Sequence, residues 1–257
     1  WRISEEPFLK KMQESWLTNL KVRYSYGEVG SDKGAPRFNY IQLFESGGNV
    51  TFGKNQNVSF GPLYTEGSLA YHDATWETAV KQNLGIEMTL FRKLLASIDL
   101  FKEDRTGILM SRNSSAPWMG TGLPSVNIGK TKNHGLELEL GWNDKVGKNF
   151  SYFAKFNFST SENRVVFKDD PNRLDDYLKA AGKPIGYVNK YLVSGNFGSI
   201  DDIFNYTQSG ITNGSQNKLI PGDLIYLDYN GDGVINEKDM APVANLNYPL
   251  TTYGLTL

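Results

Sequence analysis

Apolar and polar residues alternate with a period of two in four segments of the chain, residues 20–26, 83–90, 136–142 and 152–159. Successive side chains of a β-strand point to opposite faces, whereas a helix would spread the same apolar residues around its axis. The pattern therefore predicts β-strands in these four segments, each with one apolar and one polar face, and a further strand is expected to start near Leu94. The apolar face is expected to hold Leu84, Ile86, Met88, Leu136, Leu138, Leu140, Phe156 and Phe158, and the polar face Glu137, Glu139 and Lys155.

The connections between these strands alternate strictly between short and long. A tight turn at 91–93 and a polar link at 143–149 are short, whereas residues 28–75, 105–133 and 163–249 form long connections. Transmembrane barrels have this rhythm, with short periplasmic turns and long extracellular loops. We therefore predict an all-β fold, an antiparallel transmembrane β-barrel segment with long extracellular loops. A soluble β-domain with extended loops is the alternative, because the outer surface of a sandwich also accepts a polar face.

Charged and aromatic residues favour the barrel over the soluble domain. Glu87 and Asp99 lie in the middle of expected strands, where a water-filled lumen would solvate them at little cost. Trp16, Trp76 and Trp142 lie near strand ends, as the aromatic girdles of a membrane barrel do. With the polar face in the lumen, the apolar face would meet lipid.

Composition narrows the functional classes. The net charge is −1, which gives no support for a nucleic-acid partner. The chain has no cysteine, so disulfides, zinc–thiolate sites and thiol nucleophiles are excluded. Its two histidines, His72 and His134, do not have a metal-binding spacing, and no carboxylate pair stands out. We predict no catalytic residues and no enzymatic activity.

Residues 228–239, DYNGDGVINEKD, have the oxygen spacing of a calcium-binding loop. The expected ligands are Asp228, Asn230, Asp232, Val234 through its carbonyl, and Asp239. Gly233 would allow the sharp turn that such a loop needs. Because Asp replaces the usual Glu at the last position, Mg²⁺ is a second, less favoured candidate for this structural ion. The alternative is an Asx-rich turn held by its own side-chain hydrogen bonds.

The long connection 163–249 is expected to carry the calcium loop and a short helix at 171–182, which Pro171 begins and Gly182 ends. Aromatic side chains in the long connections are candidates for contact with a substrate or a lid protein, because such rings stack on sugars and anchor interfaces. These candidates are Trp118, Tyr187, Tyr191 and Phe197. Ordinary packing within the loops is the alternative for each.

Stretches spread over almost the whole chain resemble one known family. They are WRISEEPFLK at the start, LKVRYSYGEVGSD, TWETAVKQNLGIE, GLELELGW, and PGDLIYLDYNGDGVINEKDMAPVANLNYPLTTYGLTL at the end. In this order and spacing they resemble the SusC/RagA-like TonB-linked (TonB-dependent) outer-membrane proteins of Bacteroidetes. No single stretch is decisive. The resemblance implies that residues 1–257 are a later part of a roughly 22-stranded barrel, with 163–249 as a long extracellular loop region.

The resemblance also implies a function and partners. Such proteins import oligosaccharides or peptides across the bacterial outer membrane in a TonB-dependent manner, together with a SusD-like surface lipoprotein. TonB would act through a plug region, and neither a plug, a TonB box nor a final terminal strand is visible in this chain. The sequence starts at Trp1 and ends on a strand-like TTYGLTL, so we expect a fragment of a longer protein. The alternative function is a soluble, calcium-stabilised cell-surface β-domain that binds glycans.

Overall fold

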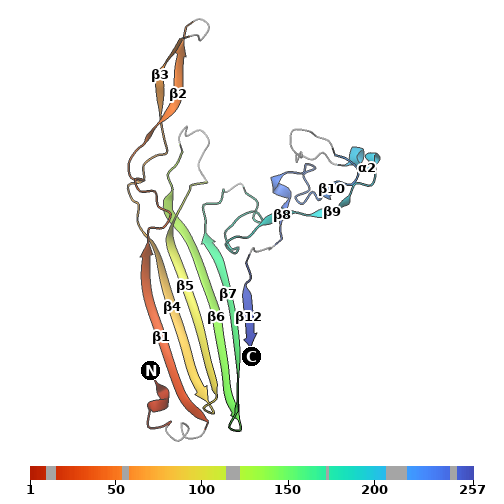
Figure 1. Cartoon of the computed structure of the whole chain (residues 1–257). Helices are drawn as coiled ribbons and strands as arrows, with labels where there is room; N and C mark the ends of the chain where they lie inside the picture. Colours follow the sequence, from red (N-terminus) through yellow and green to blue (C-terminus); the bar gives the residue numbers. More distant parts are fainter. Residues whose placement is uncertain (10–15, 54–57, 114–121, 172–173, 207–218, 244–247) are drawn as a thin grey trace. The chain divides into compact units, whose positions relative to one another are not determined.

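The computed structural model describes residues 1–9, 16–53, 58–113, 122–171, 174–206, 219–243 and 248–257 (Figure 1). Contacts divide the chain into two compact units. Unit 1 comprises residues 1–169 and 249–257, and unit 2 comprises residues 170–248. Among the described residues, no helix has both the length and the apolar character needed to cross a membrane.

Unit 1 is built on one six-stranded antiparallel sheet, whose strands lie side by side in Figure 1. In spatial order they are β1 (Leu17–Ser31), β4 (Glu77–Leu90), β5 (Leu94–Met110), β6 (Val126–Val146), β7 (Phe150–Phe167) and β12 (Thr251–Thr256). Each strand pairs with the next one in this order, and the sheet stays open. The all-β antiparallel prediction is therefore confirmed.

Four strands, β1, β5, β6 and β7, extend further than the apolar pattern predicts. The long connections span 32–76, 111–125 and 168–250 instead of 28–75, 105–133 and 163–249. Pairing continues through polar residues, for example between Asp104 and Lys132. The alternation of apolar and polar residues stops where these polar residues begin, whereas the backbone hydrogen bonds between the strands continue beyond that point.

The strand register converts the period-two pattern into rows across the sheet. The middle row contains Val22, Ile86, Ile98, Leu138, Phe158 and Tyr253. The row on one side of it contains Leu20, Met88, Ala96, Leu140, Phe156 and Leu255. The row on its other side contains Tyr24, Leu84, Leu100, Leu136, Thr160 and Thr251. All eight positions predicted to be apolar lie on this face, which we call the apolar face. Glu137, Glu139 and Lys155 lie on the opposite, polar face, as predicted.

Two tight turns join strands at one end of the sheet. In the turn 91–93, the N–H of Lys93 donates to the carbonyl of Leu90 at 3.0 Å. Phe91 and Arg92 have φ values of 55° and 59°, a left-handed conformation that is uncommon for side chains of this size. Gly147, with a φ of 66°, provides the same conformation in the turn between β6 and β7.

The first long connection contains a hairpin that the sequence pattern did not predict. It consists of β2 (Phe44–Phe52) and β3 (Val58–Glu66), which pair antiparallel. Phe44, Phe52 and Tyr64 are 64%, 59% and 65% exposed, so the hairpin presents aromatic rings to solvent.

Unit 2 contains two small two-stranded sheets. They pair β8 (Asn189–Tyr191) with β11 (Met240–Pro242), and β9 (Val193–Asn196) with β10 (Leu224–Tyr226). A helix, α2 (Ile200–Asn205), and a 3-10 helix, η3 (Glu237–Asp239), complete the described elements. Among the described residues of this unit, the buried ones are Phe197, Ile235, Asp239 and Ala241.

The helix predicted at 171–182 is wrong for the described residues of that segment, which form turns. The carboxylate of Asp170 accepts the N–H groups of Ala180 and Ala181 at 2.9 and 3.1 Å. A carboxylate from outside the segment therefore takes backbone donors that a helix would have bonded internally. Sequence reasoning missed α2, whose start is fixed by a capping box between Ser199 and Asp202.

Candidate functional site

The polar face of the sheet carries ion pairs that cross strands. Arg23 on β1 reaches over β4 to Asp99 on β5, with Nη2 2.6 Å from Oδ2. The residue beneath the guanidinium is Gly85, where an added Cβ would lie 2.3 Å from the Arg23 Nε and 2.8 Å from the Asp99 Oδ1. Glycine at this position therefore makes the bridge across β4 possible.

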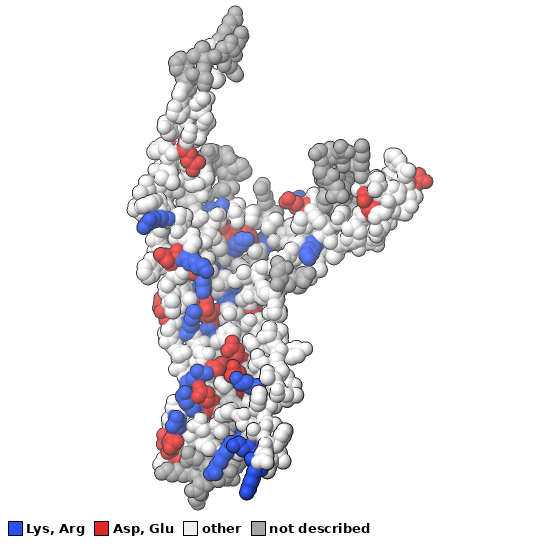
Figure 2. All heavy atoms as spheres, in the orientation of Figure 1, with Lys and Arg blue, Asp and Glu red and all other residues white. Residues whose placement is uncertain are grey.

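Further ion pairs extend this network along the same face, which is the one seen in Figure 2. The neighbouring pairs are Lys21–Glu87 at 3.2 Å and Arg23–Glu87 at 3.3 Å, followed by Lys81–Glu103 at 3.5 Å, Arg105–Glu103 at 2.8 Å and Arg105–Glu77 at 2.8 Å. Each exposed pair contributes at most about 1 kcal/mol. The network thus fixes side-chain positions on the polar face more than it stabilises the fold.

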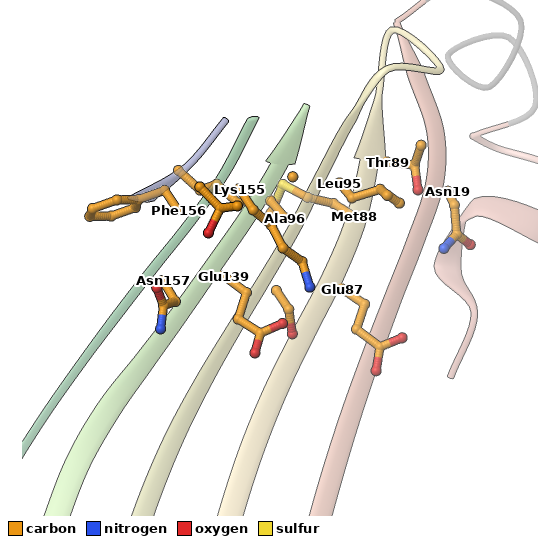
Figure 3. Close-up of a pocket in the computed structure, with 14 residues that line it drawn as sticks. Asn19, Glu87, Met88, Thr89, Leu95, Ala96, Glu139, Lys155, Phe156 and Asn157 are labelled. Atoms are coloured by element: carbon orange, nitrogen blue, oxygen red, sulfur yellow. The ribbon is translucent and has the colours of Figure 1, made fainter. Parts of the chain in front are cut away.

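A hollow of about 490 Å³ lies on this face, towards the end with the tight turns (Figure 3). Its polar lining includes Asn19, Glu87, Glu139, Lys155 and Asn157, contributed by β1, β4, β6 and β7. In Figure 3 the Lys155 side chain points into the hollow, between Glu139 and Glu87. Within the described part of the chain, neither Glu139 nor Lys155 forms an ion pair within 4.0 Å.

The lining suits recognition of a polar solute rather than a reaction. Carboxylate, ammonium and amide groups can exchange hydrogen bonds with hydroxyl, amide or charged groups of a ligand. The pocket lining contains no histidine, so no nucleophile there is paired with a histidine base. The sequence reasoning found Glu87, Glu139 and Lys155 from their period-two positions. It missed the Arg23–Asp99 bridge, because that contact skips one strand and depends on register.

The predicted calcium loop is held by its own hydrogen bonds. The two carboxylate oxygens of Asp228 accept the N–H groups of Gly231 and Gly233 at 2.7 and 2.8 Å. Asp232 accepts the Asn230 side-chain amide at 2.9 Å and the Val234 N–H at 2.9 Å. These two hydrogen bonds hold the pKa of the Asp232 carboxyl below its usual value.

Asp239 departs from the other expected ligands because it is completely buried. Its carboxylate accepts the N–H groups of Tyr229, Asn230 and Asn236 at 2.9, 3.3 and 2.7 Å. In the described residues, no group of three or more His, Cys, Asp or Glu side chains is arranged to hold a metal ion. The hard oxygens of Asp228, Asn230 and Asp232 fit the chemistry of Ca²⁺, and Ca²⁺ binding stays a prediction.

The aromatic contact candidates fall into three situations. Trp118 lies outside the described residues. Phe197 is only 2% exposed and packs edge-on against Tyr206 at 5.1 Å, so its ring lies in the interior of unit 2, as the alternative of ordinary loop packing expects. Tyr187 and Tyr191 are half-buried, and both remain candidates.

The surroundings of these two tyrosines restrict what they can do. Lys183 Nζ lies 4.8 Å from the centre of the Tyr187 ring, and burial lowers the pKa of the Lys183 ammonium. The Tyr191 ring packs on Tyr226 at 5.4 Å, and burial raises the pKa of the Tyr191 phenol. Both rings are therefore packed within unit 2 and remain partly exposed.

Comparison with known proteins gives relatives over almost the whole chain. TonB-dependent receptor P39 of Formosa agariphila is 30% identical over 264 residues, covering 90% of this chain and 24% of that protein. TonB-dependent receptor SusC of Bacteroides thetaiotaomicron is 24% identical, covering 93% of this chain and 23% of that protein. The chain thus spans about a quarter of the length of these relatives.

Solved structures and a family model agree with these sequence relatives. The RagAB peptide importer in its open-open state matches with a TM-score of 0.65 at 17% identity, covering 99% of this chain and 26% of that chain. The RagAB peptide transporter matches with a TM-score of 0.62 at 18% identity. This likeness concerns the fold. The family described as TonB dependent receptor-like, beta-barrel matches residues 10–255. The chain belongs to this family, and it is a SusC/RagA-like segment of a bacterial outer-membrane β-barrel.

Proposed function

We propose that this chain forms part of the wall and outer loops of an importer that takes up oligosaccharides or peptides across the outer membrane. Uptake would depend on TonB, acting through a plug region, and on a SusD-like lipoprotein as the lid. The single observation that carries the proposal is the division of one sheet into an apolar face and a polar face with a charged network and a hollow. In an outer-membrane barrel these faces meet lipid and the aqueous lumen respectively.

The polar face would serve passage of a hydrophilic solute. Its ion-paired side chains provide both hydrogen-bond donors and acceptors, so a polar solute can form hydrogen bonds with this face. Because opposite charges are paired there, no large net charge of one sign would repel or trap the solute. The hollow around Lys155 and Glu139 would provide one point of contact along that path. The long connections, with the exposed aromatic rings of the β2–β3 hairpin, would face the lid and incoming substrate.

Uptake by cells tests the proposal. A strain lacking the full-length gene would be supplied with the wild-type gene or none, and given labelled oligosaccharides and labelled peptides in separate arms. We expect gene-dependent uptake of one class, its loss when TonB is deleted, and recovery of the ligand uncleaved from purified protein. A SusD-like lipoprotein should copurify with the wild-type protein. Uptake that is independent of the gene for both classes would overturn the proposal.

A further inference from the structure

A second set of charged residues lies on the apolar face, just beyond its apolar rows. The strand register continues past Leu100 and Leu136 into a row with Lys102 and His134. The next row contains Lys132 and Arg164, and Lys130 follows two residues away along β6. We call Lys102, Lys130, Lys132, His134 and Arg164 the basic patch, and all five side chains are exposed.

The position of the basic patch relative to the membrane follows from its strands. β5 ends at Met110 and β6 begins at Val126, so the long connection 111–125 leaves the sheet from the same end as the patch. Long connections are external in outer-membrane barrels. Lys102 and His134 follow the last apolar row by two residues, Lys132 by four and Lys130 by six, which is roughly 7, 14 and 20 Å along a strand. The patch therefore lies at the outer edge of the apolar band, where lipid headgroups are expected.

Ion pairs within the patch leave part of its charge uncompensated. Lys102 pairs with Asp104 at 2.7 Å, and Arg164 pairs with Glu162 at 2.6 Å. The side chains of Lys130 and Lys132 form no hydrogen bond and no ion pair within 4.0 Å with another described residue, and the Glu162 carboxylate interacts with the Lys132 charge from a longer distance. Two neighbouring ammonium groups on β6 are thus available to a ligand with negative charge.

The chemistry of such a ligand is defined by what surrounds the two lysines. A soluble anion would contact only the charged lysine side chains. A lipid would contact the lysines with its headgroup and the neighbouring apolar rows with its acyl chains. A molecule that satisfies both features has an anionic headgroup that reaches Lys132 and Lys130, two and three rows beyond the last apolar row, and hydrocarbon that contacts the apolar rows. Basic residues next to a membrane segment attract such lipids by about 1 kcal/mol each.

We propose that the basic patch binds the phosphate-bearing headgroup of a lipid in the outer leaflet, with Lys130 and Lys132 as the principal contacts. The acyl chains of that lipid lie along the apolar rows of β5, β6 and β7. This site is on the lipid-facing side of the wall, so it is separate from the polar face through which a solute would pass. It gives the importer a fixed contact to the membrane beside its external loops.

Lipid binding by the purified full-length protein in detergent tests the proposal. The probes are phosphatidic acid, phosphatidylcholine with the same acyl chains, and inorganic phosphate, with bound lipid counted by native mass spectrometry. Lys130→Gln/Lys132→Gln removes the two free charges of the patch. Lys81→Gln/Lys155→Gln removes two lysine charges from the polar face of the same sheet and is the matched control.

We expect phosphatidic acid to bind more tightly than phosphatidylcholine. The patch variant should lose about 30-fold in affinity, at about fivefold for each lysine, while the control variant keeps wild-type binding. Equal binding of the two lipids, an equal loss in both variants, or no loss in the patch variant would overturn the proposal. Displacement of the lipid by inorganic phosphate at equal concentration would also overturn it, because the site would then recognise a free anion.

Discussion

Gly85 is the residue on which the Arg23–Asp99 ion pair depends. An added Cβ would lie 2.7 Å from the Arg23 Cγ as well as 2.3 Å from its Nε, so the side chain would have to take another rotamer. We expect Gly85→Ala to lower the free energy of unfolding by about 1–2 kcal/mol through this crowding and the loss of the pair. Thermal unfolding of the full-length protein in detergent measures the change.

Gly27→Ala is the control for Gly85→Ala. Gly27 lies on β1 at a polar-face position, and an added Cβ there would meet nothing within 4 Å. Its substitution should leave the unfolding temperature unchanged or raise it slightly, because alanine loses less conformational freedom on folding. Equal destabilisation by both alanines would show that crowding under Arg23 is not the cause.

Arg92 carries backbone strain that a glycine would relieve. Its φ of 59° lies in the left-handed region, which costs a residue with a Cβ roughly 1–2 kcal/mol. Part of the gain is lost because glycine has more freedom in the unfolded chain. We expect Arg92→Gly to raise the free energy of unfolding by about 0.5–1 kcal/mol. Lys93→Gly, at a position without positive φ, should lower it, and the same unfolding assay compares the two.

Adjacent positions on β5 test the assignment of the two faces. Ile98 lies between Ile86 and Leu138 on the apolar face, whereas Ser97 lies between Glu87 and Glu139 on the polar face. Ile98→Arg places a charge against lipid and should cost about 2–4 kcal/mol near the middle of the band. Ser97→Arg should cost much less, because water and two carboxylates receive the guanidinium. Similar losses of folded protein in the outer membrane for both variants would contradict the assignment.

The loop 228–239 is predicted to gain stability from Ca²⁺. The ion would offset the repulsion between Asp228 and Asp232, whose side chains are already oriented by backbone N–H groups. We expect Asp228→Ala/Asp232→Ala to make unit 2 easier to cleave by protease, and to remove any protection that millimolar Ca²⁺ gives the wild type over a chelator. The sheet of unit 1 should stay folded.

The pH dependence of the same loop has a definite sign. Hydrogen bonds lower the pKa of Asp232 in the folded state, so its contribution to stability is present above the usual carboxyl pKa. That contribution is lost as pH falls through the lowered value. Protection of the loop against protease should therefore weaken in acid. If the wild-type protein is protected equally with Ca²⁺ and with chelator at neutral pH, the Ca²⁺ prediction is contradicted and only the Asx-turn interpretation remains.

The sequence predicted the strands better than the contacts between them. Alternation identified the apolar face correctly, because each leucine on β6 has the same role wherever the strand pairs. It could not predict that Arg23 bridges to Asp99, since that depends on which residues face each other two strands apart. It also ended the strands early, because the residues around Lys102 and Lys132 are polar on both faces.

Sequence reasoning was least accurate in unit 2. Its packing depends on a few buried groups, and two of them break simple rules. Asp239 is charged yet fully buried, because three backbone N–H groups satisfy it. Phe197 is an aromatic residue in a long connection, yet it is part of the interior. When a long connection has its own buried core, residue type alone does not predict which of its side chains are buried.

The separation of the chain into two units predicts that their roles can be separated experimentally. Unit 2 has its own buried residues, and the sheet of unit 1 is completed by β12 pairing with β7. The Thr160 and Thr251 hydroxyls are 3.0 Å apart at the start of this pairing, so the chain re-enters the sheet through contacts within unit 1. We expect full-length protein with residues 170–248 replaced by a flexible Gly-Ser linker to assemble in the outer membrane, as measured by heat-resistant folding on gels.

The same replacement should abolish uptake and copurification of the lipoprotein if unit 2 provides the surface on which the proposed lid docks. Loss of these activities in a protein that is still folded and inserted would assign docking to unit 2, because the polar face and the hollow of unit 1 are unchanged in that variant. The Asp228→Ala/Asp232→Ala variant is the matched comparison, since it keeps the segment and alters only its loop. Normal uptake by the replaced protein would place lid docking on the other long connections, 32–76 and 111–125. Failure to assemble would show that β12 needs unit 2 to find its partner strand.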